Sequence, residues 1–130
     1  MAKILVIDDQ RSIRNTLKDI LEYEDHSVEL AEHGEEGVEK FKADKYDVVL
    51  CDIKMPNMDG ITTTRTIRES SDLKAMSDIP IVALTAHAMK GDKERFLGVG
   101  MDDYLAKPVE FVDLVSVLSR IASIIRKRES

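Results

Sequence analysis

The chain has 130 residues and a formal net charge of −6 at pH 7, from 19 Lys and Arg against 25 Asp and Glu. This length is typical of one domain and allows a core without disulfides or a structural metal. Hydrophobic residues make up 43% and charged residues 34%, which indicates a globular chain rather than a disordered one. The acidic charge argues against direct nucleic-acid binding.

The sequence shows no pattern typical of secretion or of a membrane span. The only apolar run near the N-terminus, at 4–7, is too short for a signal peptide, and no run approaches the roughly 18 residues of a membrane helix. The single cysteine, Cys51, excludes an intramolecular disulfide and fits a reducing compartment. We expect a cytoplasmic protein without a membrane partner, one domain over 1–130 with its core over about 3–126.

Short apolar runs recur along the chain and predict strands. In chain order these runs are 4–7, 28–31, 48–51, 79–84 and 104–106. Three of them, at 4–7, 48–51 and 79–84, are apolar on both faces, which is typical of strands buried on both sides of a sheet. The run at 28–31 alternates instead and indicates an edge strand.

Between the predicted strands the apolar spacing changes to that of a helix. Ile13, Leu17, Ile20 and Leu21 form one stripe, a second helix is expected from Gly34, and the strongest stripe runs over 111–125. The segment 60–70 is a weaker candidate, predicted because a parallel crossover needs a helix there. Five strands alternating with five helices predict an α/β fold, a doubly wound parallel sheet whose active site lies beyond the carboxyl ends of the strands.

Polar residues follow four of the predicted strands. They are Asp8, Asp9, Asp52, Thr85 and Lys107. Three carboxylates in one place repel one another unless a cation offsets them, and oxygen ligands of high charge suit Mg²⁺. A lysine and a hydroxyl beside them can stabilise a phosphoryl group, so the set favours phosphoryl transfer onto a carboxylate.

Each of these residues also has an ordinary structural interpretation. Asp8 and Asp9 fit a helix cap, where aspartate is common, Asp52 fits a turn, and Lys107 before Pro108 fits a solvent-exposed turn. Thr85 alone fits the end of a strand. The functional interpretation is favoured because all five residues fall at the carboxyl ends of four separate predicted strands.

Four segments carry a resemblance to a known family. They are 4–9 (ILVIDD), 47–60 (DVVLCDIKMPNMDG), 80–86 (PIVALTA) and 100–108 (GMDDYLAKP). In this order and at these spacings, they resemble the receiver domains of two-component response regulators, over nearly the whole chain. The resemblance implies a flavodoxin-like fold with five parallel strands in the order 2-1-3-4-5.

The resemblance also implies a metal site. Asp52 would be the phosphoacceptor and a ligand of Mg²⁺, with Mn²⁺ as an alternative ion. Asp9 would bind the ion directly and Asp8 through water, and the backbone carbonyl of Lys54 would complete the protein ligands.

Five further positions match the family in other roles. Thr85 and Lys107 would contact the phosphoryl group, and Tyr104 would be the aromatic switch residue. Pro108 matches a proline that usually follows a cis peptide bond, which would direct Lys107 into the site. Gly60 would permit a tight turn at the start of the third helix.

The function implied is a phosphorylation switch rather than a conventional enzyme. A histidine kinase or histidine phosphotransfer protein would donate the phosphoryl group to Asp52, and the domain would assist this transfer and a slow hydrolysis. Movement of Thr85 and Tyr104 would then change the surface of the fourth helix, fifth strand and fifth helix. That surface would bind an output protein or domain, and it is also the expected surface for dimerisation.

Three other hypotheses remain open from the residues. An aspartate-nucleophile phosphohydrolase needs a second acid two residues after the nucleophile, where Asp8 and Asp52 are followed by Gln10 and Lys54. A flavin or nucleotide site needs a glycine-rich loop after a strand, which is absent. A phosphate-independent interaction module is the third. His87, two residues past Thr85, either tunes the lifetime of the phosphoryl group or is an ordinary residue at a helix start.

Overall fold

A computed structural model of the chain describes residues 2–69, 79–86 and 91–129, and its strands and helices alternate. The elements are β1 (Lys3–Ile7), α1 (Arg11–Tyr23), β2 (Ser27–Ala31), α2 (Gly34–Ala43), β3 (Val48–Asp52), α3 (Gly60–Glu69), β4 (Ile81–Thr85), α4 (Asp92–Gly98), β5 (Asp103–Ala106) and α5 (Phe111–Glu129). His87 lies outside the described residues.

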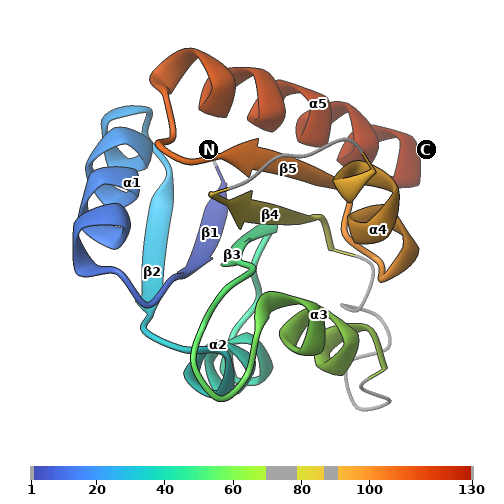
Figure 1. Ribbon diagram of the computed structural model, residues 1–130. Coiled ribbons are helices and arrows are strands. Elements are labelled where there is room, and N and C mark those ends of the chain that lie inside the picture. Colours follow the sequence, from blue (N-terminus) through green and yellow to red (C-terminus); the bar gives the residue numbers. More distant parts are fainter. Residues whose placement is uncertain (1, 70–78, 87–90, 130) are drawn as a thin grey trace.

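The five strands form one parallel sheet in the order β2-β1-β3-β4-β5. Helices α1 and α5 cover one face of the sheet, and α2 and α3 cover the other, so the sheet is the middle of three layers (Figure 1). This confirms the predicted doubly wound architecture and strand order. The carboxyl ends of the central strands β1, β3 and β4 therefore meet at one edge of the sheet.

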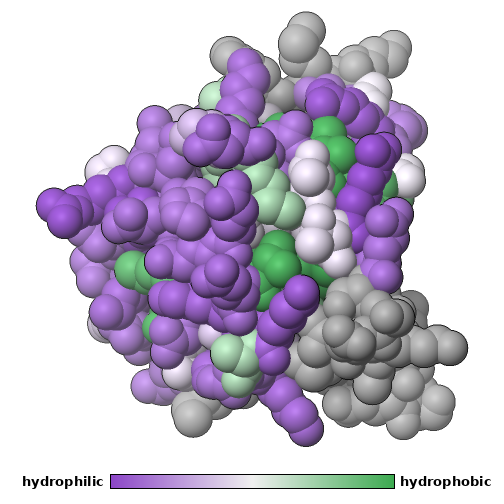
Figure 2. Space-filling view, turned by 90° about the horizontal axis from the view of Figure 1, so that it is seen from below, coloured by the Kyte–Doolittle hydropathy of each residue, from purple (hydrophilic) through white to green (hydrophobic). Residues whose placement is uncertain are grey.

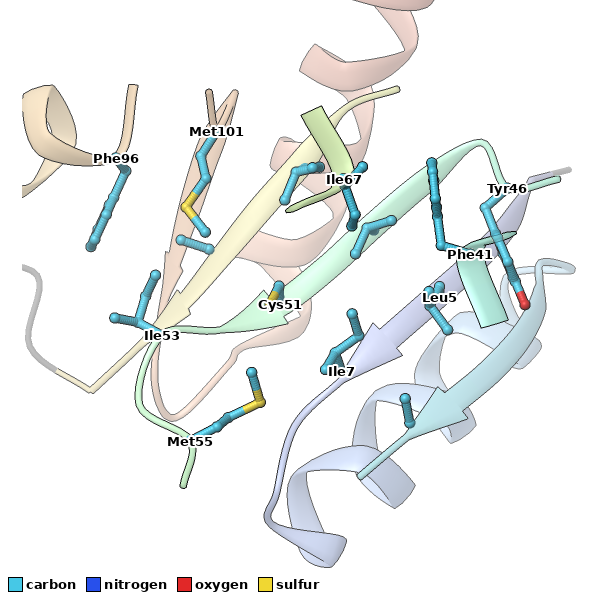
Figure 3. Close-up of a cluster of buried hydrophobic side chains, with 14 residues drawn as sticks. Leu5, Ile7, Phe41, Tyr46, Cys51, Ile53, Met55, Ile67, Phe96 and Met101 are labelled. Atoms are coloured by element: carbon cyan, nitrogen blue, oxygen red, sulfur yellow. The ribbon is translucent and has the colours of Figure 1, made fainter. Parts of the chain in front are cut away.

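The core has two halves, one on each face of the sheet. Toward α1 and α5, the strands pack against Leu17, Leu21 and Leu114, each at most 1% exposed. Toward α2 and α3 they pack against residues that include Phe41 and Ile67, and the cluster is drawn in Figure 3. Every residue of β3 and of β4 is buried, as the continuous apolar runs predicted, and the alternating β2 is an edge strand.

The predicted strands differ from the structure by one or two residues at their ends, and α3 explains its own weak sequence pattern. The fourth strand begins at Ile81 instead of at 79, and Pro80, which has no N–H to donate to the sheet, comes just before it. Helix α3 has a weak apolar pattern because its buried face includes Thr63 and Thr64, both fully buried. The hydroxyl of Thr63 donates to the carbonyl of Asp59, which satisfies it inside the protein.

The described surface is mainly polar. Figure 2 shows one face on which hydrophilic residues dominate and hydrophobic residues are visible only in limited areas. Within the described residues, no helix is both long enough and apolar enough to cross a bilayer.

Candidate functional site

The carboxyl edge of the sheet holds a cavity of about 440 Å³. Its lining includes five residues singled out from the sequence: Asp9, Asp52, Lys54, Thr85 and Lys107. Asp52 and Thr85 are the last residues of β3 and β4, rather than the residues after them. The prediction that strand ends gather these side chains at one place is therefore correct.

Three carboxylates form the acidic part of the site. Asp8, Asp9 and Asp52 each offer an oxygen, and these atoms all lie within 4.8 Å of one another. Asp8 is fully buried and Asp52 is 4% exposed, whereas Asp9 faces solvent. The negative charge is thus concentrated where water screens it poorly.

One lysine from the β5–α5 connection lies against the two buried carboxylates. Lys107 Nζ lies 2.8 Å from Asp8 Oδ2 and 3.2 Å from Asp52 Oδ1. Burial opposes the charge of Lys107, but Asp8 and Asp52 outweigh it and raise the lysine pKa. Burial and then the charge of Asp8 raise the pKa of Asp52 from 3.8 to about 6, against the lowering effect of Lys107.

The donor set fits a hard divalent cation. One lysine offsets only part of the charge of three carboxylates, and carboxylate oxygens are ligands that Mg²⁺ prefers. Asp8 Oδ2 is buried without a well-aligned hydrogen-bond donor, although Lys107 Nζ pairs with it ionically at 2.8 Å. This oxygen therefore retains capacity to accept a further hydrogen bond.

The helix-cap interpretation of Asp8 and Asp9 is wrong. The N-cap of α1 is Gln10, whose side chain makes no capping hydrogen bond. Instead, Asp8 Oδ1 accepts a hydrogen bond from the backbone N–H of Gln10 at 2.9 Å. The bond holds Asp8 inside the turn between β1 and α1, at the site.

The proposed switch pair lies on adjacent strands. Thr85 is 7% exposed, and its register partner on β5 is Ala106, two residues after Tyr104. Tyr104 and Thr85 therefore point to the same face of the sheet. The half-buried Tyr104 ring packs against Phe96 of α4, with 6.4 Å between the centroids.

Gly60 is needed for a different reason from the one the sequence suggested. Its φ is not in the left-handed region, but a Cβ there would lie 2.3 Å from the backbone oxygen of Asp52 and 2.9 Å from the Cα of Ile53. Helix α3 thus begins directly against the strand end that carries Asp52. The Lys107–Pro108 bond is cis, as the resemblance implies.

Sequence reasoning missed several residues of the site. Gln10, Asp92 and Arg95 also line the cavity, and Arg14 lies buried behind the β1–α1 turn. A sequence signal for Arg14 exists, because it precedes Leu17 by three residues and so falls on the buried face of α1. No comparable pattern marks the other three.

Comparisons with known proteins agree with this geometry. The family model described as the response regulator receiver domain matches residues 4–119. The signal transduction histidine-protein kinase BarA of Escherichia coli K12 is 40% identical over 117 residues, which are 90% of this chain and 12% of that protein. The response regulator MprA of Mycolicibacterium vanbaalenii is 36% identical over 125 residues, 96% of this chain and 51% of that protein. The chain thus spans about half the length of MprA and about an eighth of BarA.

Solved structures share the fold. The chemotaxis protein CheY4 of Vibrio cholerae has a TM-score of 0.84 at 32% identity, over 93% of this chain and 98% of that one. The receiver domain of the sensor histidine kinase PA1611 from Pseudomonas aeruginosa has a TM-score of 0.81 at 34% identity, with the same coverages. In that structure a magnesium ion is coordinated in the active-site cleft.

Proposed function

The chain belongs to the response regulator receiver domain family of two-component phosphorelay signalling, and on this premise we propose that Asp52 is its phosphoacceptor in a Mg²⁺-dependent reaction. The observation that carries the proposal is the convergence of Asp52, two further carboxylates and Lys107 at the carboxyl edge of the sheet, where Asp9, Asp52 and Lys107 line one cavity. Asp8, Asp9 and Asp52, with the backbone carbonyl of Lys54, would hold the ion.

The donor is a phosphohistidine of a histidine kinase or of a histidine phosphotransfer protein. A carboxylate oxygen of Asp52 attacks the phosphorus, the phosphorus–nitrogen bond breaks, and the imidazole leaves with a proton from solvent. Because the pKa of Asp52 is about 6, its carboxyl group is ionised and nucleophilic in most molecules at neutral pH. When bound, Mg²⁺ would supply positive charge that offsets the negative charge of the transferring phosphoryl group.

Two side chains stabilise the phosphoryl group after transfer. Lys107 lies 3.2 Å from Asp52 Oδ1 and donates to the phosphoryl oxygens, and Thr85 at the cavity wall donates its hydroxyl. Movement of Thr85 makes room for Tyr104 to turn inward, which alters the surface formed by α4, β5 and α5. That surface binds an output protein or domain and serves for dimerisation.

The same cavity hydrolyses the acyl phosphate slowly, without the multiple turnover of a conventional enzyme.

Mn²⁺ can replace Mg²⁺, since both prefer oxygen ligands. We propose one receiver domain over 1–130 with its core over about 3–126. We also propose that the chain acts in the cytoplasm. The alternative phosphohydrolase has little support, because Gln10 and Lys54 occupy the positions where it needs a second acid.

The test is acetyl phosphate with Mg²⁺, followed by intact mass spectrometry. The wild type gains one phosphate, and Asp52→Asn gains none. The matched control is Asp47→Asn, an exposed aspartate at the opposite end of the sheet, which gains phosphate as the wild type does. Phosphate on a histidine or threonine, or transfer without a dication, would contradict the proposal. Equal affinity of a partner for wild type and Asp52→Asn would instead support the phosphate-independent module.

A further inference from the structure

Arg14 is a buried cation behind the acidic site. It belongs to α1 and is 7% exposed. Its Nη1 donates a hydrogen bond of 2.7 Å to the backbone oxygen of Asp8, and its Nη2 lies 3.6 Å from Oε1 of the exposed Glu32. A buried guanidinium is unfavourable unless its N–H groups find hydrogen-bond acceptors, and the backbone carbonyl of Asp8 is one such acceptor.

The bond to Asp8 acts on the peptide group that joins two metal-binding candidates. The carbonyl that Arg14 holds lies between Asp8 and Asp9, and a peptide group is planar, so fixing this oxygen fixes the direction in which the chain enters Asp9. The side chain of Asp8 is held separately, by the N–H of Gln10 and by Lys107. The N–H of Asp8 donates to the carbonyl of Ala31 on β2, and Arg14 is the side chain that holds the carbonyl of Asp8 on the other side of this residue.

We infer that Arg14 is a positioning residue for the dication: through the Asp8 carbonyl, it holds the β1–α1 turn in the shape that brings the carboxylates of Asp8 and Asp9 together with that of Asp52. The inference rests on the proposed function, because it needs the proposed Mg²⁺ site. Partners that orient metal ligands from outside the coordination sphere typically affect metal affinity about 10-fold or more.

Three possible roles of Arg14 predict different changes in Mg²⁺ affinity when Arg14 is replaced. An arginine that positions the ligands makes Mg²⁺ bind more weakly when it is replaced. An arginine that acts only through its charge repels a dication, so its replacement makes Mg²⁺ bind more tightly. If the arginine only stabilises the fold, its replacement lowers the melting temperature and leaves the Mg²⁺ affinity of the folded protein unchanged.

The experiment is a titration of the full chain with Mg²⁺ alone, by calorimetry or by amide chemical shifts, with folding checked by circular dichroism in EDTA. We expect Arg14→Met to raise the Kd about 10-fold and Arg14→Lys to raise it about 3-fold, because lysine keeps one donor and the charge. Two controls stay within about twofold of the wild type. Glu32→Gln removes the ion pair and keeps the bond to Asp8, and Lys18→Met removes a cation one turn along the same helix.

Unchanged or tighter Mg²⁺ binding in a folded Arg14 variant overturns the inference. So does an equal loss in Glu32→Gln, because the ion pair would then be the important contact. If Arg14→Met does not fold, Arg14→Lys decides: a Kd equal to that of the wild type overturns the inference. A wild type that binds no Mg²⁺ overturns the proposed function itself, which keeps the two failures distinct.

Discussion

The two ends of the sheet carry the same kinds of charged residue in opposite surroundings. At the carboxyl end, Lys107 pairs with Asp8 and Asp52, whose side chains are 0% and 5% exposed. At the amino end, Lys3 pairs with Asp44, and these side chains are 31% and 53% exposed. The side chains of the amino-end pair are largely open to water, whereas those of the carboxyl-end group are mostly buried.

The aspartates respond in opposite directions. The hydrogen bond from Lys3 holds the pKa of Asp44 below its ordinary value. At the other end, burial and the charge of Asp8 raise the pKa of Asp52 to about 6 despite the neighbouring lysine. Water stabilises the charges of the exposed pair, whereas the burial of Asp52 leaves an electrostatic cost that a dication can relieve. Burial, rather than residue type, therefore makes one end a candidate reaction site.

The largest expected effect tests how tightly the carboxyl end is built. Gly60→Ala places a Cβ 2.3 Å from the backbone oxygen of Asp52, so the strand end and α3 must move apart. We expect a loss of about 3 kcal/mol in the free energy of unfolding, measured by urea denaturation. Gly98→Ala is the control, because nothing lies within 4 Å of its Cβ and the variant keeps wild-type stability or gains slightly. Equal losses in both variants would show that the close contact is unimportant.

The next effect separates the two lysines. Lys107→Met removes the cation 3.2 Å from Asp52 Oδ1 and slows phosphorylation by acetyl phosphate about 100-fold. Lys3→Met removes the amino-end lysine and leaves the rate unchanged. The rates are measured by mass spectrometry at saturating Mg²⁺. Similar rates for both variants would remove the functional distinction between the two ends.

A smaller effect concerns the electrostatic cost at Asp52. The folded chain protonates Asp52 at about pH 6 and an ordinary aspartate protonates at 3.8, so the folded state binds more protons between these values. The contribution of the Asp52 carboxyl to the free energy of unfolding is thus fully present below about pH 4 and is lost as the pH rises through about 6. Asp52→Asn therefore stabilises the metal-free protein by about 2 kcal/mol at neutral pH and hardly at all near pH 4.

This difference is measured by urea denaturation in EDTA at both pH values. Excess Mg²⁺ stabilises the wild type, because it binds the folded chain, and so reduces the advantage of the variant. A variant advantage that is the same at both pH values would mean that ionisation of Asp52 carries no cost.

The smallest effect is expected at the amino end. Lys3→Met shifts the melting temperature by less than about 2 °C, because exposed ion pairs contribute little. Whatever shift occurs at low salt disappears when salt screens the pair. A large drop in melting temperature that does not depend on salt would mean that the exposed pair at the amino end contributes as much to stability as a buried pair.

Local patterns were sufficient to predict most of the fold and much of the site. The continuous apolar runs predicted the buried strands β3 and β4, and chain order placed Asp52 and Thr85 together at the carboxyl edge. Helix α3 was weakly marked because buried threonines resemble exposed ones in a sequence. The roles of individual site residues stay predictions that the experiments above decide.

By itself, the sequence determined where the chain alternates between strand and helix and which polar residues end the strands, because both follow from side chains close in the chain. Only the tertiary structure decided which charges lose their water. Lys107 reaches Asp8 from 99 residues away, and Arg14 reaches the carbonyl of Asp8 across a turn. The pKa of Asp52 and the requirement for Gly60 depend on such contacts, since desolvation and close approach are set by neighbours that the folded chain brings together.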